Sequence, residues 1–256
     1  MPDHKKSGFD NVSDEKEMGF LDHLEELRWR IIKAIAGIII GAVICGFFSD
    51  WIMDKVLLAP ALHTNPPLTL INLKPYGQVV IYMQVIIVCG AILSIPNIFY
   101  QFWRFIEPGL LPSESKYVAW IVFYSSFCFL GGIAFAYFIM LPTALTFFAG
   151  FGTGAIANNI AVDEYLSFII AVLLAAGVVF ELPMVSFFLS KIGILKPQFM
   201  RKYRRHSIVI FLILAAILAP SPDVTSQLML GIPLIILYEI SILISKFSQP
   251  KKELDE

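Results

Sequence analysis

The sequence lacks the motifs that build the common nucleotide-binding and hydrolytic sites. It contains no GxxxxGKS/T phosphate loop, no HExxH zinc motif and no GxSxG nucleophile motif. Its three cysteines, Cys45, Cys89 and Cys128, lie in apolar runs without metal-binding spacing, so they indicate packing. These absences predict a protein that is not an enzyme and that needs no cofactor, metal ion or nucleic acid.

Charged residues are also scarce. They make up 15% of the 256 residues, whereas hydrophobic residues make up 57%, which is too apolar for a soluble domain. The chain is therefore predicted to be an all-α polytopic membrane protein with six transmembrane helices. The predicted spans cover residues 31–48, 78–100, 117–141, 168–189, 208–219 and 228–244.

Proline and length set the expected shape of several spans. Pro96 is expected to kink the second span near its end. The run 208–219 would form about 18 Å of helix, against a hydrocarbon core of about 30 Å. The last run, 228–244, is expected to be broken by Pro233 and Glu239. The last two runs are therefore predicted to be two short spans or a re-entrant hairpin.

The distribution of basic residues predicts the orientation. Seventeen of the nineteen Lys and Arg residues fall on one side of the predicted spans, and only Lys55 and Lys74 fall on the other. Because basic loops stay in the cytoplasm, both termini are predicted to be cytoplasmic. The chain is divided into a flexible tail (1–19), a single six-helix membrane domain (20–247) and a C-terminal tail (248–256). The proline-rich first outer loop is expected to form a short helix and an extended turn.

One acid lies at membrane depth. Glu181 stands inside the run 168–189, where a charge costs about 2.5 kcal/mol or more, so it should face protein, a polar partner or water. Pro183 leaves a backbone carbonyl without its donor, and Gly177 is expected to clear space beside the carboxylate. Three interpretations stay open: a docking site, a protonated acid bonded to a neighbouring helix, and the proton site of a secondary transporter.

Acids also stand on the predicted cytoplasmic side, where basic residues are expected to dominate. They are Glu25, Glu26, Glu107 and Glu114. A carboxylate beside a membrane can bind a guanidinium bidentately, which would suit an arginine-bearing ligand. Two other interpretations remain: the amphipathic segment around Glu26 and Arg30 is a solvated lead-in to the first span, and Glu114 favours the start of the third helix.

Five short motifs, in this order, resemble the TatC family, the polytopic subunit of the twin-arginine protein translocase. They are His23-Leu-Glu-Glu-Leu-Arg, Tyr100-Gln-Phe-Trp-Arg-Phe-Ile-Glu-Pro, Phe135-Ala-Tyr-Phe, Phe180-Glu-Leu-Pro and Pro222-Asp-Val-Thr-Ser-Gln. The resemblance implies a concave, cup-like protein of the bacterial inner membrane that recognises twin-arginine signal peptides on folded cargo proteins. It also implies single-span partners of the TatA and TatB kind, a homo-oligomeric receptor complex and use of the proton-motive force.

The resemblance also assigns roles to individual residues. Those assigned to signal-peptide binding are His23, Glu26, Leu27, Arg28, Phe105 and Glu114. Those assigned to partner docking within the membrane are Glu181 and Gln227, and those assigned to the outer loops are Pro60 and Asp223. The sequence departs from the family at one point, because Ser115 and Lys116 follow Glu114 where a basic pair is common. A proton-coupled secondary transporter that uses Glu181 is the alternative function, although no internal repeat supports it.

Overall fold

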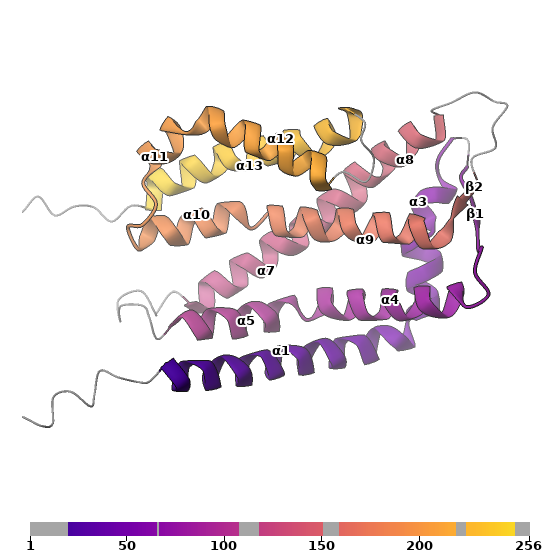
Figure 1. Cartoon of the computed structure of the whole chain (residues 1–256), viewed down its shortest axis with the longest axis horizontal. Helices are drawn as coiled ribbons and strands as arrows, with labels where there is room; N and C mark the ends of the chain where they lie inside the picture. Colours follow the sequence, from indigo (N-terminus) through magenta and orange to yellow (C-terminus); the bar gives the residue numbers. More distant parts are fainter. Residues whose placement is uncertain (1–19, 66, 108–117, 151–158, 219–223, 249–256) are drawn as a thin grey trace, which may run out of the picture.

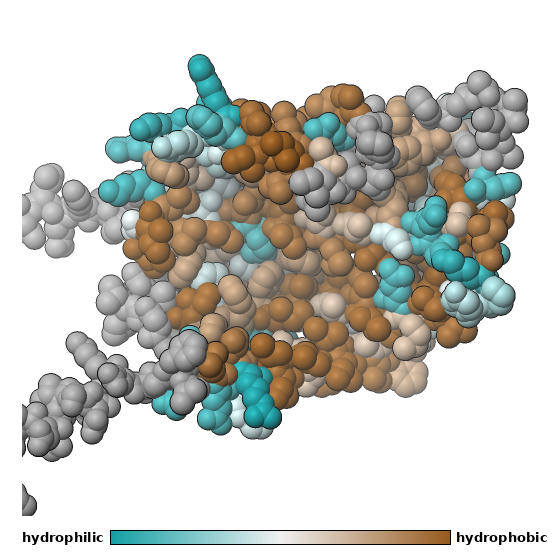
Figure 2. All heavy atoms as spheres, in the orientation of Figure 1, coloured by the Kyte–Doolittle hydropathy of each residue, from teal (hydrophilic) through white to brown (hydrophobic). Residues whose placement is uncertain are grey.

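The protein is a bundle of helices whose polar side chains gather mainly at its two ends. The computed structural model describes residues 20–65, 67–107, 118–150, 159–218 and 224–248. Figure 1 shows most of the long helices aligned with one axis and α7 inclined across them. Figure 2 shows hydrophobic side chains over the middle of the molecule. The prediction of an all-α polytopic membrane protein is confirmed.

The first half of the described chain forms a long helix, a capping segment and a bent helix. Its elements are α1 (Phe20–Phe47), α2 (Ser49–Trp51), the π-helical turn η1 (Ile52–Leu57), α3 (Ala59–Leu62), β1 (Thr69–Ile71), α4 (Gly77–Leu93) and α5 (Ile95–Ile106). Helices α4 and α5 meet at an angle of 56°. Pro96 lies in the first turn of α5 and has no N–H for the preceding turn, so the predicted kink is confirmed.

The second half contains two long helical rods and a final hairpin. Its elements are α7 (Val118–Phe135), the π-helical turn η3 (Ala136–Met140), α8 (Leu141–Gly150), β2 (Asn159–Ala161), α9 (Val162–Val179), α10 (Leu182–Lys191), α11 (Pro197–Lys202), α12 (Arg204–Leu218) and α13 (Val224–Ser248). The rods Val118–Gly150 and Val162–Lys191 are 33 and 30 residues long, which is enough to cross a membrane.

The number of spans is settled only in part. Among the described residues, four helices are long and apolar enough to cross a membrane, and a fifth span results if α4 and α5 count as one. Helix α12 has 15 residues, or about 22 Å, and is short as expected. The count of six spans and the orientation of the termini stay predictions. The predicted tails lie outside the described residues, except for Ser248 at the end of α13.

The last helix differs from its prediction. α13 is continuous for 25 residues, with Pro233 inside it, so the predicted break is wrong. A proline inside a helix costs about 3 kcal/mol, which packing must offset. Leu234, Tyr238, Ser241 and Ser245 are buried along α13. Because α13 is packed against α10, α11 and α12, these contacts keep it helical through the proline.

A small parallel sheet lies at the end of the molecule opposite the start of α1 and the end of α13. Strand β1 pairs with β2, with Leu70 opposite Ile160, and Lys74 Nζ lies 2.5 Å from Asp163 Oδ2. The hydrogen bond to Asp163 raises the pKa of the Lys74 ammonium group. The sequence predicted an extended turn here but not its pairing with a second loop.

Helices α1 and α4 touch backbone to backbone. A Cβ atom added to Gly41 would lie 2.5 Å from the carbonyl oxygen of Gly90, and one added to Gly90 would lie 2.4 Å from the backbone nitrogen of Ala42. The Ser94 hydroxyl donates to the carbonyl oxygen of Gly37 at 2.6 Å. Small residues that let membrane helices approach closely gain dispersion contacts, so this contact fixes α1 against the bent α4–α5 pair.

Candidate functional site

The start of α1 and the end of α5 lie together at one end of the molecule (Figure 1). The rings of His23 and Phe105 stack with centroids 4.3 Å apart and an interplanar angle of 18°. These residues are far apart in the sequence, and both belong to the predicted signal-peptide set. The structure therefore brings together the two motifs that carry them.

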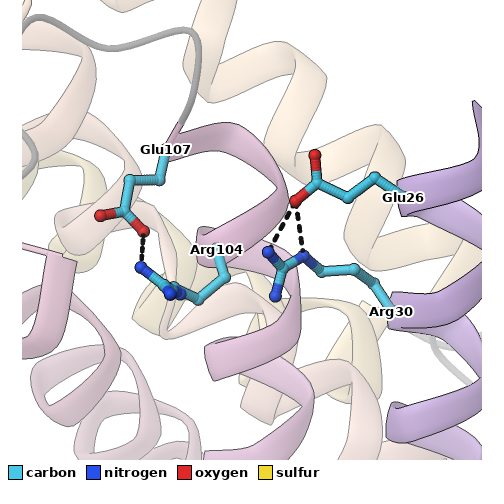
Figure 3. A network of polar contacts seen from close by, with 4 residues as sticks. All are labelled: Glu26, Arg30, Arg104 and Glu107. Atoms are coloured by element: carbon cyan, nitrogen blue, oxygen red, sulfur yellow. Dashed lines mark hydrogen bonds and ion pairs between the residues drawn. The ribbon is translucent and has the colours of Figure 1, made fainter. Parts of the chain in front are cut away.

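Glu26 is paired with an arginine of its own helix, and Figure 3 shows the contact. Arg30 donates to one carboxylate oxygen, Oε1, through Nη2 at 2.6 Å and Nε at 3.1 Å. The side chains of Glu26 and Arg30 are 32% and 19% exposed. Figure 3 shows the second oxygen of Glu26 turned away from Arg30. Because a carboxylate accepts through both oxygens, Glu26 keeps capacity for a further donor.

A second ion pair lies on α5, the helix that faces α1. Arg104 Nη1 donates to Glu107 Oε2 at 2.6 Å, between residues three positions apart (Figure 3). Glu26 and Glu107 thus each have an arginine partner within four residues of the same chain segment. An incoming guanidinium would have to share a carboxylate with an internal arginine or displace it.

Three further residues were predicted for this site, and two of them are described by the structure. Leu27 is half-buried and Arg28 is exposed on α1. Glu114 lies outside the described residues, so its predicted pairing with Glu26 is untested. Asp223, in the predicted outer loop, also lies outside the described residues, so its predicted role is untested.

Pro60 lies at the other end of the molecule. It is half-buried in α3 and lines a pocket of about 280 Å³ together with Tyr137 and Pro142. In the predicted first outer loop, where a short helix and an extended turn were expected, the chain forms α2, η1 and α3 followed by the strand β1.

Glu181 stands at the break between α9 and α10. Its polar neighbours are the Ser125 hydroxyl and the backbone of Phe129, both on α7. One carboxyl oxygen, Oε1, is buried without a hydrogen-bond partner among the described residues. A Cβ atom added to Gly177 would lie 2.8 Å from the Phe129 ring. The expectation that Gly177 clears space beside the carboxylate is therefore wrong, because Phe129 of the same chain fills that space.

Gln227 and Glu239, two polar residues of the last helix, have partners within the chain. Gln227 Nε2 donates to the carbonyl oxygen of Leu212 at 2.9 Å and so ties α13 to α12. Arg204 forms an ion pair with Glu239. Gln227 is predicted to face a partner helix, and that prediction stays untested.

Two amides on α5 were not singled out from the sequence. Asn97 Nδ2 donates to the carbonyl oxygen of Lys33 at 3.2 Å, and Gln101 Nε2 donates to Asn97 Oδ1 at 3.3 Å. The available signal was their four-residue spacing in a helix that is otherwise rich in aromatic residues. Gln101 is 8% exposed and Asn97 is half-buried, and the network ties α5 to the backbone of α1.

Comparison with known proteins gives one consistent family. The family model "Sec-independent protein translocase protein (TatC)" matches residues 22–233. The chain is 39% identical to the protein TatC of Aquifex aeolicus over 238 residues, which cover 92% of this chain and 98% of that protein. It is 37% identical to TatC of Carboxydothermus hydrogenoformans over 239 residues, covering 93% and 97%.

Solved structures agree with these matches. A crystal structure of the twin-arginine translocase receptor TatC has a TM-score of 0.77 and 38% identity, covering 88% of this chain and 99% of that one. A crystal structure of the same receptor in DDM has a TM-score of 0.78 and 39% identity, covering 87% and 99%.

Proposed function

The chain belongs to the TatC family and is a multi-pass subunit of the Sec-independent protein translocase; from that premise we propose that it recognises twin-arginine signal peptides of folded cargo proteins where α1 meets α5. The observation that carries this proposal is the Glu26 carboxylate, which has one oxygen held by Arg30 and one turned away. A guanidinium can donate two parallel hydrogen bonds to a carboxylate, whereas an ammonium group acts as a point charge. The stacked rings of His23 and Phe105 offer an aromatic surface nearby.

Glu26→Ala is expected to weaken binding of a twin-arginine signal peptide about tenfold or more, because a hydrogen bond to a charged group contributes about 1.5–3 kcal/mol. Glu26→Asp keeps the charge and should cost less. Glu114→Ala should also weaken binding if both acids hold the arginine pair. The measurement is the dissociation constant of a labelled peptide from the purified full-length protein in detergent.

Glu25→Ala is the matched control, because Glu25 is the neighbouring exposed acid and its loss changes the net charge equally. A peptide with two lysines in place of the arginines tests the geometry of recognition. Equal binding by Glu26→Ala, Glu25→Ala and the unaltered protein would refute this proposal.

The partners of the subunit follow from the same family. We propose that TatA- and TatB-type single-span proteins dock within the membrane near Glu181 and Gln227, that several copies of this chain assemble in the receptor complex, and that the proton-motive force drives transport. The buried Oε1 atom of Glu181, which has no hydrogen-bond partner among the described residues, supports the docking site. Pro60 and Asp223 are proposed to act at the outer end.

We also propose a location in the bacterial inner membrane with both termini in the cytoplasm. The start of α1 and the end of α13 lie at the same end of the molecule in Figure 1, which supports a common side for the termini. The basic segment of α11 and the start of α12 lies at that end as well, whereas Lys74 belongs to the opposite end.

In a variant whose three cysteines are replaced by alanine, a cysteine at Asp223 is expected to react with an impermeant maleimide added outside intact cells. A cysteine at Arg204 should react only after the membrane is opened, because the positive-inside rule keeps that segment in the cytoplasm. Labelling of Arg204→Cys in intact cells would reverse the orientation. An unreactive Asp223→Cys would instead favour a re-entrant final hairpin.

A further inference from the structure

The amide network of α5 leaves one buried acceptor without a donor. Asn97 must donate through Nδ2 to the carbonyl oxygen of Lys33, so its Oδ1 accepts from Gln101. That contact fixes Nε2 of Gln101 as the donor, and rotating the amide would oppose two oxygens. The Gln101 Oε1 atom then remains buried with no hydrogen-bond partner among the described residues. A buried acceptor without a donor is costly, so this atom requires an explanation.

Two contacts between α1 and α5 indicate which stretch of α1 lies opposite this acceptor. Asn97 contacts the backbone of α1 at Lys33, and Phe105 stacks on His23. Gln101 lies midway between Asn97 and Phe105, one helical turn from each, and so on the same face of α5. The stretch of α1 between His23 and Lys33 that lies on this face contains Glu26 and Arg30. In Figure 3 the guanidinium of Arg30 extends from α1 toward α5.

Arg30 is a donor on the stretch of α1 that this register places opposite Gln101. Its side chain is only 19% exposed, and its hydrogen bonds, through Nε and Nη2, both go to Glu26. If a ligand guanidinium takes the Glu26 carboxylate, Arg30 loses its partner in a place that water reaches poorly. A partly buried guanidinium without an acceptor would oppose ligand binding.

We propose that Gln101 is the acceptor that receives Arg30 when an arginine of the signal peptide displaces it from Glu26. This inference rests on the proposed function, and it assigns Gln101 a positioning role without contact to the ligand. In this exchange the ligand gains the Glu26 carboxylate, and Arg30, which gives up its two hydrogen bonds to Glu26, gains the Gln101 Oε1 atom as an acceptor. The site therefore binds an arginine without leaving its own arginine unpaired, and binding is relayed from α1 to α5.

The test is a double-mutant cycle on the full-length protein in detergent, with a labelled twin-arginine signal peptide as the probe. Gln101→Leu is expected to weaken binding about tenfold, because the displaced Arg30 then finds no acceptor. In an Arg30→Gln background no cation is displaced, so adding Gln101→Leu should change the affinity less than twofold. Gln84→Leu, on α4, is the matched control and should bind as the unaltered protein does.

Each outcome of the cycle decides the inference. Equal losses from Gln101→Leu in both backgrounds would overturn it, because they indicate a direct ligand contact or a general structural defect. No loss in either background would also overturn it. The proposed function is judged separately by Glu26→Ala: it fails if that variant binds normally, whereas this inference alone fails if Glu26→Ala loses binding and Gln101→Leu does not. The melting temperature of each variant is also measured without peptide, so that a general structural defect is recognised.

Discussion

Gly90→Leu is expected to leave little correctly folded protein. A Cβ atom at Gly90 would meet the backbone nitrogen and Cα atom of Ala42 at 2.4 and 2.6 Å, and backbone atoms cannot rotate away as a side chain can. Helices α1 and α4 would have to separate, which would also break the hydrogen bond from Ser94 to Gly37. Overpacking of this kind costs about 3 kcal/mol or more. The measurement is the free energy of unfolding in mixed micelles, together with the yield of monodisperse protein.

Gly46→Leu is the control, because an added Cβ atom at Gly46 of α1 meets nothing within 4 Å. It should fold as the unaltered protein does, since leucine also favours helix over glycine. Gly90→Ala, which adds only the clashing Cβ atom, should fall between the two. Comparable stability of Gly90→Leu and Gly46→Leu would mean that α1 does not pack closely on α4.

The second large effect is expected at Glu181, where transport by the complete translocase should fall at least tenfold in Glu181→Ala and Glu181→Leu. In the docking hypothesis the side chain meets a polar group of a partner helix, worth about 1.5–3 kcal/mol if it is charged. Glu181→Gln keeps an acceptor oxygen and should retain most transport. The measurements are the export rate of a folded cargo and crosslinking to the single-span partner in the same membranes.

The alternative transporter hypothesis gives a different pattern. If the proton itself moves through Glu181, Glu181→Gln should be as inactive as Glu181→Ala, because an amide cannot change its protonation state. Loss of export in Glu181→Gln with unchanged crosslinking would revive that hypothesis. The structure favours docking, since the nearest candidate for a relay, Glu239, is already held in an ion pair with Arg204.

Most of the architecture could be predicted because apolar runs and prolines act locally. The low charge content indicated a membrane protein, and Pro96 indicated the bend between α4 and α5. The predicted break at Pro233 is wrong because it considered only the local effect of proline. Packing along α13 outweighs that effect. The local effect of proline therefore predicted the bend at Pro96 correctly. It failed at Pro233, where packing against neighbouring helices decides the structure.

In the candidate site, contacts within one helix could be predicted from the sequence, whereas contacts between helices could not. The pairing of Glu26 with Arg30 follows from their spacing on one helix. The stacking of His23 on Phe105, and the occupation of the space beside Gly177 by Phe129, depend on which helices meet. Gln101 could not be recognised from the sequence, because its unsatisfied oxygen is defined only by the orientation of Asn97 and the backbone of α1.

The parallel pairing of β1 with β2 limits the order in which the nascent chain can be completed. Between the two strands the chain must form α4, α5, α7 and α8, so β1 has no partner until all of these have been synthesised and inserted. The ion pair of Lys74 with Asp163 waits for the same event. Since parallel strands need such a long crossover, the segment around β1 stays without this pairing while the intervening helices are made. The pairing of β1 with β2 therefore requires that α1, the bent α4–α5 pair and the rod Val118–Gly150 have already been made.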